Sequence, residues 1–386
     1  MVESDAESRR SGANSERGPF GSPRVDRFVE WFRAPVPLES THPRFDIRRA
    51  RPAEFDRIYD LVDESFRVQR PRAVYDWLYR RNPFGLARCW VVIDRASNRL
   101  VANAASWPWP MAQGAERLEG VLGGDWVIAP EWRRQGISAL RTEVWDGHPW
   151  RGKITALSWP NEKSRGSGTK RGRGERIVGP VPRAVLPLNA ECYLAAKRWP
   201  AVFAAIGGTV ADAALEMWRA VRLPRQTGLV IEPVRRFNSS FDAVTQRCMA
   251  WHGFWSPHDA DFLNWRYLDH PAGQYTAFAV AEGADLAGYY VLKVGGLAGW
   301  LMELAVPVSP RRLGGAVLLH AAKTAREAGC AYLRFSAPPR WRHWQLLHAA
   351  GFVPTPSEIY LWPGGEGPKV RQLDMWQWVP GDMDDL

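Results

Sequence analysis

The hydrophobic and polar positions along the chain predict a clear order of elements in its first half. Residues 45–49 alternate as a half-buried strand does, and residues 54–66 place apolar side chains at helical spacing. Two further strands are predicted at residues 90–93 and 100–105, joined by a polar turn at 97–99. The first half therefore begins as strand, helix and hairpin.

The second half repeats this order. Its strand-like runs are residues 228–233, 277–280 and 288–292, and its helical run is 241–249. Between the two halves, residues 187–225 have helical spacing and many alanines. We expect this stretch to bridge the halves and pack with them, and a surface for a partner is the alternative.

A longer motif is also present twice. Residues 125–138 read DWVIAPEWRRQGIS, and residues 303–316 read ELAVPVSPRRLGGA. Both contain an acid, a β-branched residue three places on, an Arg-Arg pair, a glycine and a small residue, all shifted by one offset (303 − 125 = 178). Upstream, Trp77-Leu78-Tyr79 recurs as Trp265-Arg266-Tyr267, with an offset of its own (265 − 77 = 188). Two ordered anchors, each recurring, predict two copies of one domain.

Each copy of the longer motif has the chemistry of an anion site. An apolar strand leads into a tight turn with glycine, and an amphipathic helix comes next. The apolar positions of these helices are Ile137, Leu140 and Val144 in the first copy and Val317, Leu318, Ala321 and Ala325 in the second. The first turn of a helix presents unpaired N–H groups and the positive end of the dipole, which suit a pyrophosphate. The ending of a Walker loop and the spacing of a dinucleotide fingerprint are both missing.

The strand, the Arg-x-x-Gly-x-small turn and the helix resemble the acetyl-coenzyme A signature of the GNAT superfamily of N-acyltransferases. The residues C-terminal to each copy add to the resemblance. The strand-like residues 154–159 lead to Asn161, where the family often has an Asn that meets the cofactor, and Gly351-Phe352 matches the family's Gly-Phe turn. The first copy departs from the family at Ser138, where Gly or Ala is typical.

The resemblance implies an α/β (α+β) fold with two tandem GNAT-like domains, each a mixed, mostly antiparallel twisted sheet flanked by helices. We expect the domains at residues 43–186 and 227–386, with a helical linker at 187–226. Residues 1–42 are rich in Ser, Arg, Glu and Gly, and we expect a disordered tail there.

The resemblance also implies an activity, the transfer of an acyl group, most simply acetyl, from acetyl-CoA to an amine. The cofactor-binding residues that it implies are Ile128, Arg133, Arg134, Gln135, Gly136, Ile137, Ser138 and Asn161 in the first half, and Arg311, Arg312, Gly314 and Ala316 in the second. The first half has the fuller turn, so we expect it to bind the cofactor.

Catalysis of this reaction needs a base. An amine with a pKa of about 10.4 must lose a proton before it can attack the thioester at neutral pH. Asp125 and Glu303 occupy the same place in the two motifs, and in the family an acid on this strand often acts as the base, while a backbone N–H stabilises the oxyanion. In the alternative interpretation, each carboxylate faces the surface or a neighbouring Arg. The family's usual Tyr acid is missing after both turns, so the general acid is unassigned.

Composition bears on the charge of the ligand and on the cellular compartment of the protein. The formal net charge of +10 suits acidic ligands such as coenzyme A. The four cysteines are scattered, with neither a metal spacing nor a disulfide framework, so we expect a cytoplasmic protein without a bound metal. No run approaches the length of a membrane span, so no membrane insertion is expected.

The sequence leaves the acceptor and two other functions open. We expect a small-molecule or sugar amine as the acceptor, no nucleic acid, and leave the oligomeric state open. A non-catalytic tandem protein that binds a ligand or a partner is one alternative, which the missing Tyr supports. A tRNA-dependent aminoacyl transferase is the other; the positive charge allows it, but no coiled-coil insertion is visible.

Overall fold

The computed structural model describes most of the chain outside the N-terminal tail. The described residues are 42–140, 154–170, 177–196, 198–223, 228–309, 311–364 and 368–383. The expected disordered tail lies outside these residues except for its last position, and so does the predicted helical position Val144.

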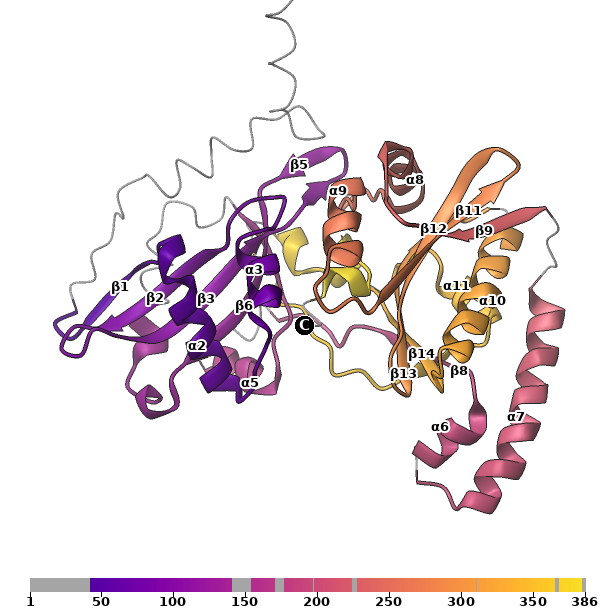
Figure 1. The fold of residues 1–386 in the computed structure, drawn as a ribbon, viewed down its shortest axis with the longest axis horizontal. Coiled ribbons are helices and arrows are strands. Elements are labelled where there is room, and N and C mark those ends of the chain that lie inside the picture. The colour runs from indigo at the N-terminus through magenta and orange to yellow at the C-terminus, as the bar shows by residue number, and fades with distance from the viewer. Residues whose placement is uncertain are drawn as a thin grey trace, which may run out of the picture.

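Five strands form the sheet of the first half, in the order β1-β2-β3-β6-β7 (Figure 1). Their bounds are β1 (Phe45–Arg49), β2 (Arg88–Asp94), β3 (Arg99–Pro108), β6 (Gly120–Ile128) and β7 (Thr155–Ser158). Neighbouring strands are antiparallel except β6 and β7, which are parallel. Helix α2 (Phe55–Phe66) contacts β3 and β6, and α3 (Arg72–Tyr79) follows it. The predicted strand, helix and hairpin are therefore confirmed.

The second half repeats this sheet. Its strands are β9 (Leu229–Pro233), β11 (Tyr275–Glu282), β12 (Asp285–Lys293), β13 (Ala298–Ala305) and β14 (Tyr332–Ser336). They too are antiparallel up to a final parallel pair, β13 and β14. Helix α8 (Ser239–Met249) follows β9, and α10 (Arg311–Glu327) follows β13 and buries its predicted apolar positions. Two tandem domains with mixed, mostly antiparallel sheets are thus confirmed.

Each half completes its sheet with a segment from the other. Strand β8 (Arg183–Pro187) lies between β14 and β15 (Val353–Thr355) of the second sheet. In return, residues 362–364 lie along β7, where the N–H of Gly364 donates to the carbonyl oxygen of Ala156 at 2.8 Å. The expected domain boundary between residues 186 and 187 therefore falls within a strand of the second sheet.

Two equivalent tryptophans stack where the halves meet. The rings of Trp77 and Trp265, which match in the Trp-x-Tyr repeat, lie 4.6 Å apart at 16°. The indole N–H of each donates to the main-chain carbonyl oxygen of the other, at 2.7 and 3.1 Å. Reciprocal contact between equivalent residues indicates an approximate two-fold axis. A hydrophobic core with residues from both halves runs through this junction, so the halves pack as one body.

The remaining elements connect or cover the two sheets. A small sheet in the order β16-β10-β4-β5 also joins the halves; its strands are β4 (Met111–Gln113), β5 (Glu116–Leu118), β10 (Phe254–Trp255) and β16 (Trp376–Gln377). The other α-helices are α5 (Glu162–Lys170), α6 (Ala190–Ala196), α7 (Ala201–Arg222), α9 (Ala260–Leu263) and α11 (Trp344–Ala349), and η4 (Asn264–Leu268) is a π-helix. Short 3-10 turns are η1 (Pro52–Glu54), η2 (Pro130–Trp132), η5 (Pro368–Arg371), η6 (Leu373–Met375) and η7 (Pro380–Asp382).

Helices α6 and α7 project together from the second half (Figure 1). They occupy the stretch that the sequence predicts to be helical, between the two halves. By length and composition alone, α7 is the one helix in the described part of the chain that could cross a membrane. The expectation that no run has this character was therefore wrong for α7, whose apolar residues are spread among alanines and glycines.

Candidate active site

The fold brings each predicted acid onto a tyrosine of the Trp-x-Tyr repeat. The hydroxyl of Tyr79 donates to Oδ2 of Asp125 at 2.7 Å, and that of Tyr267 donates to Oε1 of Glu303 at 2.5 Å. All four side chains are buried. The two repeated motifs therefore meet in the same way in each half. The signal in the sequence for this pairing was the Trp-x-Tyr repeat. The tyrosine that is usual in the GNAT family lies C-terminal to the Arg-Gly turn, whereas Tyr79 and Tyr267 lie N-terminal to it.

Asp125 lies between Tyr79 and Arg70. Nη1 of Arg70, in the loop between α2 and α3, is 3.1 Å from Oδ1 of Asp125, and the Arg70 side chain is 23% exposed. Burial raises the pKa of Asp125, and the opposing effects of Arg70 and Tyr79 offset this only in part. Asp125 thus faces a neighbouring arginine, as in the alternative interpretation, and its role as a general base stays a prediction.

A β-bulge in β6 sets the position of Asp125. Asp125 and Trp126 together lie opposite the single Ala104 of β3. The φ of Asp125 is 44°, a left-handed conformation that is uncommon outside glycine and that clusters at functional sites. Pairing between β6 and β7 ends at Gly123, so the rest of β6 is paired on one side only. This edge can offer backbone N–H groups to a developing oxyanion.

The first Arg-Arg turn has the backbone of an anion site. Arg134 and Gly136 have positive φ values of 66° and 79°, and a Cβ at Gly136 would meet no atom within 4 Å. The glycine is therefore required by conformation rather than by space, and a helix begins directly after it at residues 137–140. Arg133 donates from Nε to the carbonyl oxygen of Ile128 at 3.0 Å and braces the turn. Arg134 is exposed and so faces solvent at the start of the helix.

The other predicted cofactor positions of the first half have varied surroundings. The amide of Gln135 makes hydrogen bonds through both its nitrogen and its oxygen. Ile137 is buried in a small cluster under the sheet, and Ser138 is half-buried. Oδ1 of Asn161 accepts from the backbone N–H of Ser164 at 2.9 Å and thereby caps α5. Contact of these residues with a cofactor stays a prediction.

The second copy of the motif forms a different structure. Helix α10 begins at Arg311, so Arg311, Arg312, Gly314 and Ala316 lie inside its first turns. Gly314 does not have a positive φ, and a Cβ there would collide with the side chain of Leu346. A small residue fits closely here, but its backbone conformation does not require glycine. The left-handed turn of the first copy is therefore missing, and this geometry does not favour the predicted cofactor contacts in the second half.

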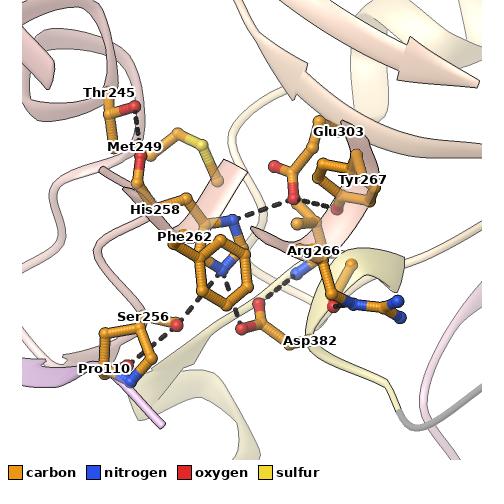
Figure 2. A network of polar contacts seen from close by, with 12 residues as sticks. Pro110, Thr245, Met249, Ser256, His258, Phe262, Arg266, Tyr267, Glu303 and Asp382 are labelled. Carbon is orange, nitrogen blue, oxygen red and sulfur yellow. Dashed lines mark hydrogen bonds and ion pairs between the residues drawn. The ribbon is translucent and has the colours of Figure 1, made fainter. Parts of the chain in front are cut away.

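Glu303 belongs to a closed network at the junction of the halves (Figure 2). Nδ1 of His258 lies 2.9 Å from Oε1 of Glu303, and Nε2 lies 2.9 Å from Oδ1 of Asp382. These three side chains are at most 1% exposed. Burial by itself lowers the pKa of His258, but Asp382 and Glu303 outweigh it and raise the pKa to about 10. His258 is therefore a buried imidazolium between two carboxyl groups at neutral pH.

The segment that carries Asp382 covers the second acid. Turn η7 contacts β13, and a Cβ at Gly381 would collide with both Tyr267 and Glu303. An acceptor amine cannot occupy the same space. The geometry therefore favours a structural role for Glu303 over the predicted catalytic one.

A cavity of about 270 Å³ opens beside the stacked tryptophans. Its walls are Trp77, Arg81, Pro83, Arg236, Asp261, Trp265 and Asp269. Nη1 of Arg236 pairs with Asp269 at 2.6 Å. The charges in the cavity wall therefore partly cancel, and the wall favours neither an anionic nor a cationic ligand. In the described part of the chain, no group of three His, Cys, Asp or Glu residues is placed to hold a metal ion.

Comparison with protein families agrees with the geometry of the first half. A model of the acetyltransferase (GNAT) domain family matches residues 46–147, which include Asp125 and the turn at Gly136. No curated protein matches the chain.

Solved structures share the fold of both halves together. A conserved protein of unknown function from Enterococcus faecalis, a probable N-acyltransferase, is 11% identical with a TM-score of 0.56, covering 82% of this chain and 71% of its own. A GCN5-related N-acetyltransferase from Anabaena variabilis is 12% identical with a TM-score of 0.55, covering 82% and 72%. The N-myristoyltransferase of Saccharomyces cerevisiae, solved with myristoyl-CoA and inhibitors, is 12% identical with a TM-score of 0.52, covering 86% and 82%. At these identities the likeness concerns the fold.

Proposed function

We propose that this protein transfers an acetyl group from acetyl-CoA to an amine, a proposal supported by the match of residues 46–147 to the model of the acetyltransferase (GNAT) domain family. We further propose that the first half performs the reaction. The observation that carries this proposal is that a left-handed Arg-Gly turn and a bulged, acid-bearing strand occur together in the first half. The second half has lost the turn and covers its acid.

In this proposal the turn holds the diphosphate of the donor. The N–H groups at the start of the helix point toward the turn, and glycine at position 136 leaves no side chain in the way. Arg134 is exposed at the same place and supplies a cation to the phosphates. Arg133 has a bracing role, because its Nε is committed to the carbonyl oxygen of Ile128. The acyl group then lies along the free edge of β6.

Asp125 takes the proton from the acceptor amine in this proposal. Its carboxyl group is held by Tyr79 on one oxygen and by Arg70 on the other. Arg70 is the half-buried member and lies on a loop, so movement of its side chain opens a route from solvent to the carboxylate. The amine nitrogen forms the new amide bond, the carbon–sulfur bond of the thioester breaks, and the thiolate leaves as coenzyme A. A small-molecule or sugar amine remains our proposed acceptor.

Coenzyme A binding tests which half holds the donor. We expect Arg134→Ala/Gly136→Ala to raise the Kd for coenzyme A by roughly 10- to 100-fold, because charge-assisted hydrogen bonds to phosphate contribute about 1.5–3 kcal/mol. The matched variant is Arg311→Ala/Arg312→Ala, which we expect to change the Kd less than about twofold. It leaves Gly314 in place, where an added Cβ would press on the end of the Leu346 side chain. Titration calorimetry measures both, and equal loss of affinity in the two variants would contradict the assignment.

A further inference from the structure

Helix α7 turns an apolar face toward solvent. Six of its apolar side chains are between 65% and 78% exposed: Val202, Phe203, Ile206, Val210, Met217 and Val221. At about 100° per residue, these positions fall on one side of the helix. By the same spacing, Ala213 and Ala220 lie within that side, and the charged residues Asp212, Glu216, Arg219 and Arg222 fall outside it.

Two charged residues of α7, Asp212 and Arg219, lie away from the apolar side and bind the protein. Arg219 is buried, and its Nε donates to the carbonyl oxygen of Ala350 at 3.1 Å. Oδ1 of Asp212 accepts from the backbone N–H of Ala190 in α6 at 3.1 Å. An ordinary amphipathic helix buries its apolar face. The contacts of Asp212 and Arg219 instead hold the polar side of α7 against the protein, so its apolar side faces solvent.

The two ends of this face combine indole rings with cations. Trp199 is 55% exposed at one end, beside the exposed Arg198, and Trp218 is 44% exposed at the other. The guanidinium of Arg222 lies 4.5 Å from the Trp218 ring. An apolar centre flanked by Trp and Arg is the pattern of a helix at a membrane surface, where indoles and long basic side chains reach the headgroup layer.

Charge argues against a second copy of this helix as the occupant. In an antiparallel pair Arg198 would meet Arg222, and in a parallel pair each Arg would meet its own counterpart. Like charges would face each other at both ends in either case, which opposes association. An anionic lipid surface instead complements both ends, and the net charge of +10 adds to the attraction.

We propose that α7 is a membrane-docking helix that lies on the surface of an anionic bilayer, with the face from Val202 to Val221 at the boundary of headgroups and acyl chains. The helix has 22 residues and does not span the bilayer, because its other side is bonded to the protein. The docking surface is independent of the donor turn at Gly136. It would bring the enzyme to a lipid surface whatever its acceptor is.

Vesicle flotation with the full chain tests this inference. We expect the protein to float with vesicles of phosphatidylcholine and phosphatidylglycerol, and to bind pure phosphatidylcholine less. Ile206→Gln/Val210→Gln is expected to lower the partition coefficient roughly tenfold or more, since two side chains no longer enter the acyl region. Gln is a good helix former, so α7 is retained, which circular dichroism and thermal melting check.

The matched control changes exposed apolar residues elsewhere. Leu297 and Val353 are 55% and 53% exposed, and Leu297→Gln/Val353→Gln is expected to bind vesicles as the unchanged protein does. Two outcomes overturn the inference. One is that the unchanged protein does not float with either kind of vesicle. The other is that light scattering finds a dimer which the α7 variant converts to monomer, because the face would then serve a second copy.

Discussion

Asp125→Asn is expected to lower kcat for acetyl transfer by about 10²- to 10⁴-fold, the usual contribution of a general base. The substitution removes proton affinity but keeps the shape of the side chain, and its amide oxygen still accepts from Tyr79. Coenzyme A binding is expected to change little, since Asp125 lies on the strand before the turn. The measurement is thiol release from acetyl-CoA with a panel of primary amines and amino sugars.

The pH profile separates a base from a merely structural acid. The pKa of Asp125 is raised by burial, so activity of the unchanged protein should rise with pH as this carboxyl group ionises. Asp125→Asn should lose that limb of the profile. Tyr79→Phe is the matched control: it removes one hydrogen bond from the carboxylate and should reduce kcat much less. If Asp125→Asn keeps full activity and an unchanged profile, Asp125 is not the base.

His258→Ala is expected to reduce the free energy of unfolding by about 3–5 kcal/mol, the usual effect of removing one partner from a buried ion pair. The carboxyl groups of Glu303 and Asp382 would then remain buried without the imidazolium between them. Urea unfolding measures the change. Ser256→Ala is the control: it removes the 3.1 Å contact with Nε2 of His258 and the 2.8 Å hydrogen bond that the hydroxyl donates to the carbonyl oxygen of Pro110, and should have an effect of about 1–2 kcal/mol. A loss for His258→Ala as small as that of the control would contradict the role of the network.

The same network predicts how stability depends on pH. The pKa of His258 is about 10 in the folded protein against an ordinary 6.5, so its stabilisation is complete below pH 6.5 and is lost as the pH rises toward 10. The pKa of Asp382 is lowered: burial alone would raise it, but His258 outweighs this. Its contribution is present above its ordinary pKa of 3.8 and is lost in more acidic solution. Unfolding free energies measured across pH should fall on the alkaline side by a few kcal/mol, and His258→Ala should remove that fall.

Hydrophobic periodicity and the constant offsets between the repeated motifs predicted much of the architecture. The apolar spacing of residues 54–66 and the alternation around 90–105 were sufficient for α2 and for the β2–β3 hairpin, because local periodicity records which face is buried. Two offsets, 178 and 188, indicated two copies of one domain. Neither offset could predict that β8 and residues 362–364 are exchanged between the sheets, since strand pairing across the halves leaves no local pattern.

The candidate site, too, was only partly predictable from the sequence. The sequence by itself indicated the Arg-Arg turns, the acids Asp125 and Glu303, and the Trp-x-Tyr anchor as candidates, because residue type and spacing are typical of that chemistry. Only the tertiary structure decided that the tyrosines hold the acids, that Gly136 adopts a left-handed turn while Gly314 is packed inside a helix, and that η7 closes over Glu303. The two copies share an acid, an Arg-Arg pair and a glycine at matching positions. They are distinguished by the distant segments that pack against each, and that packing depends on burial in the whole fold rather than on any local run of residues.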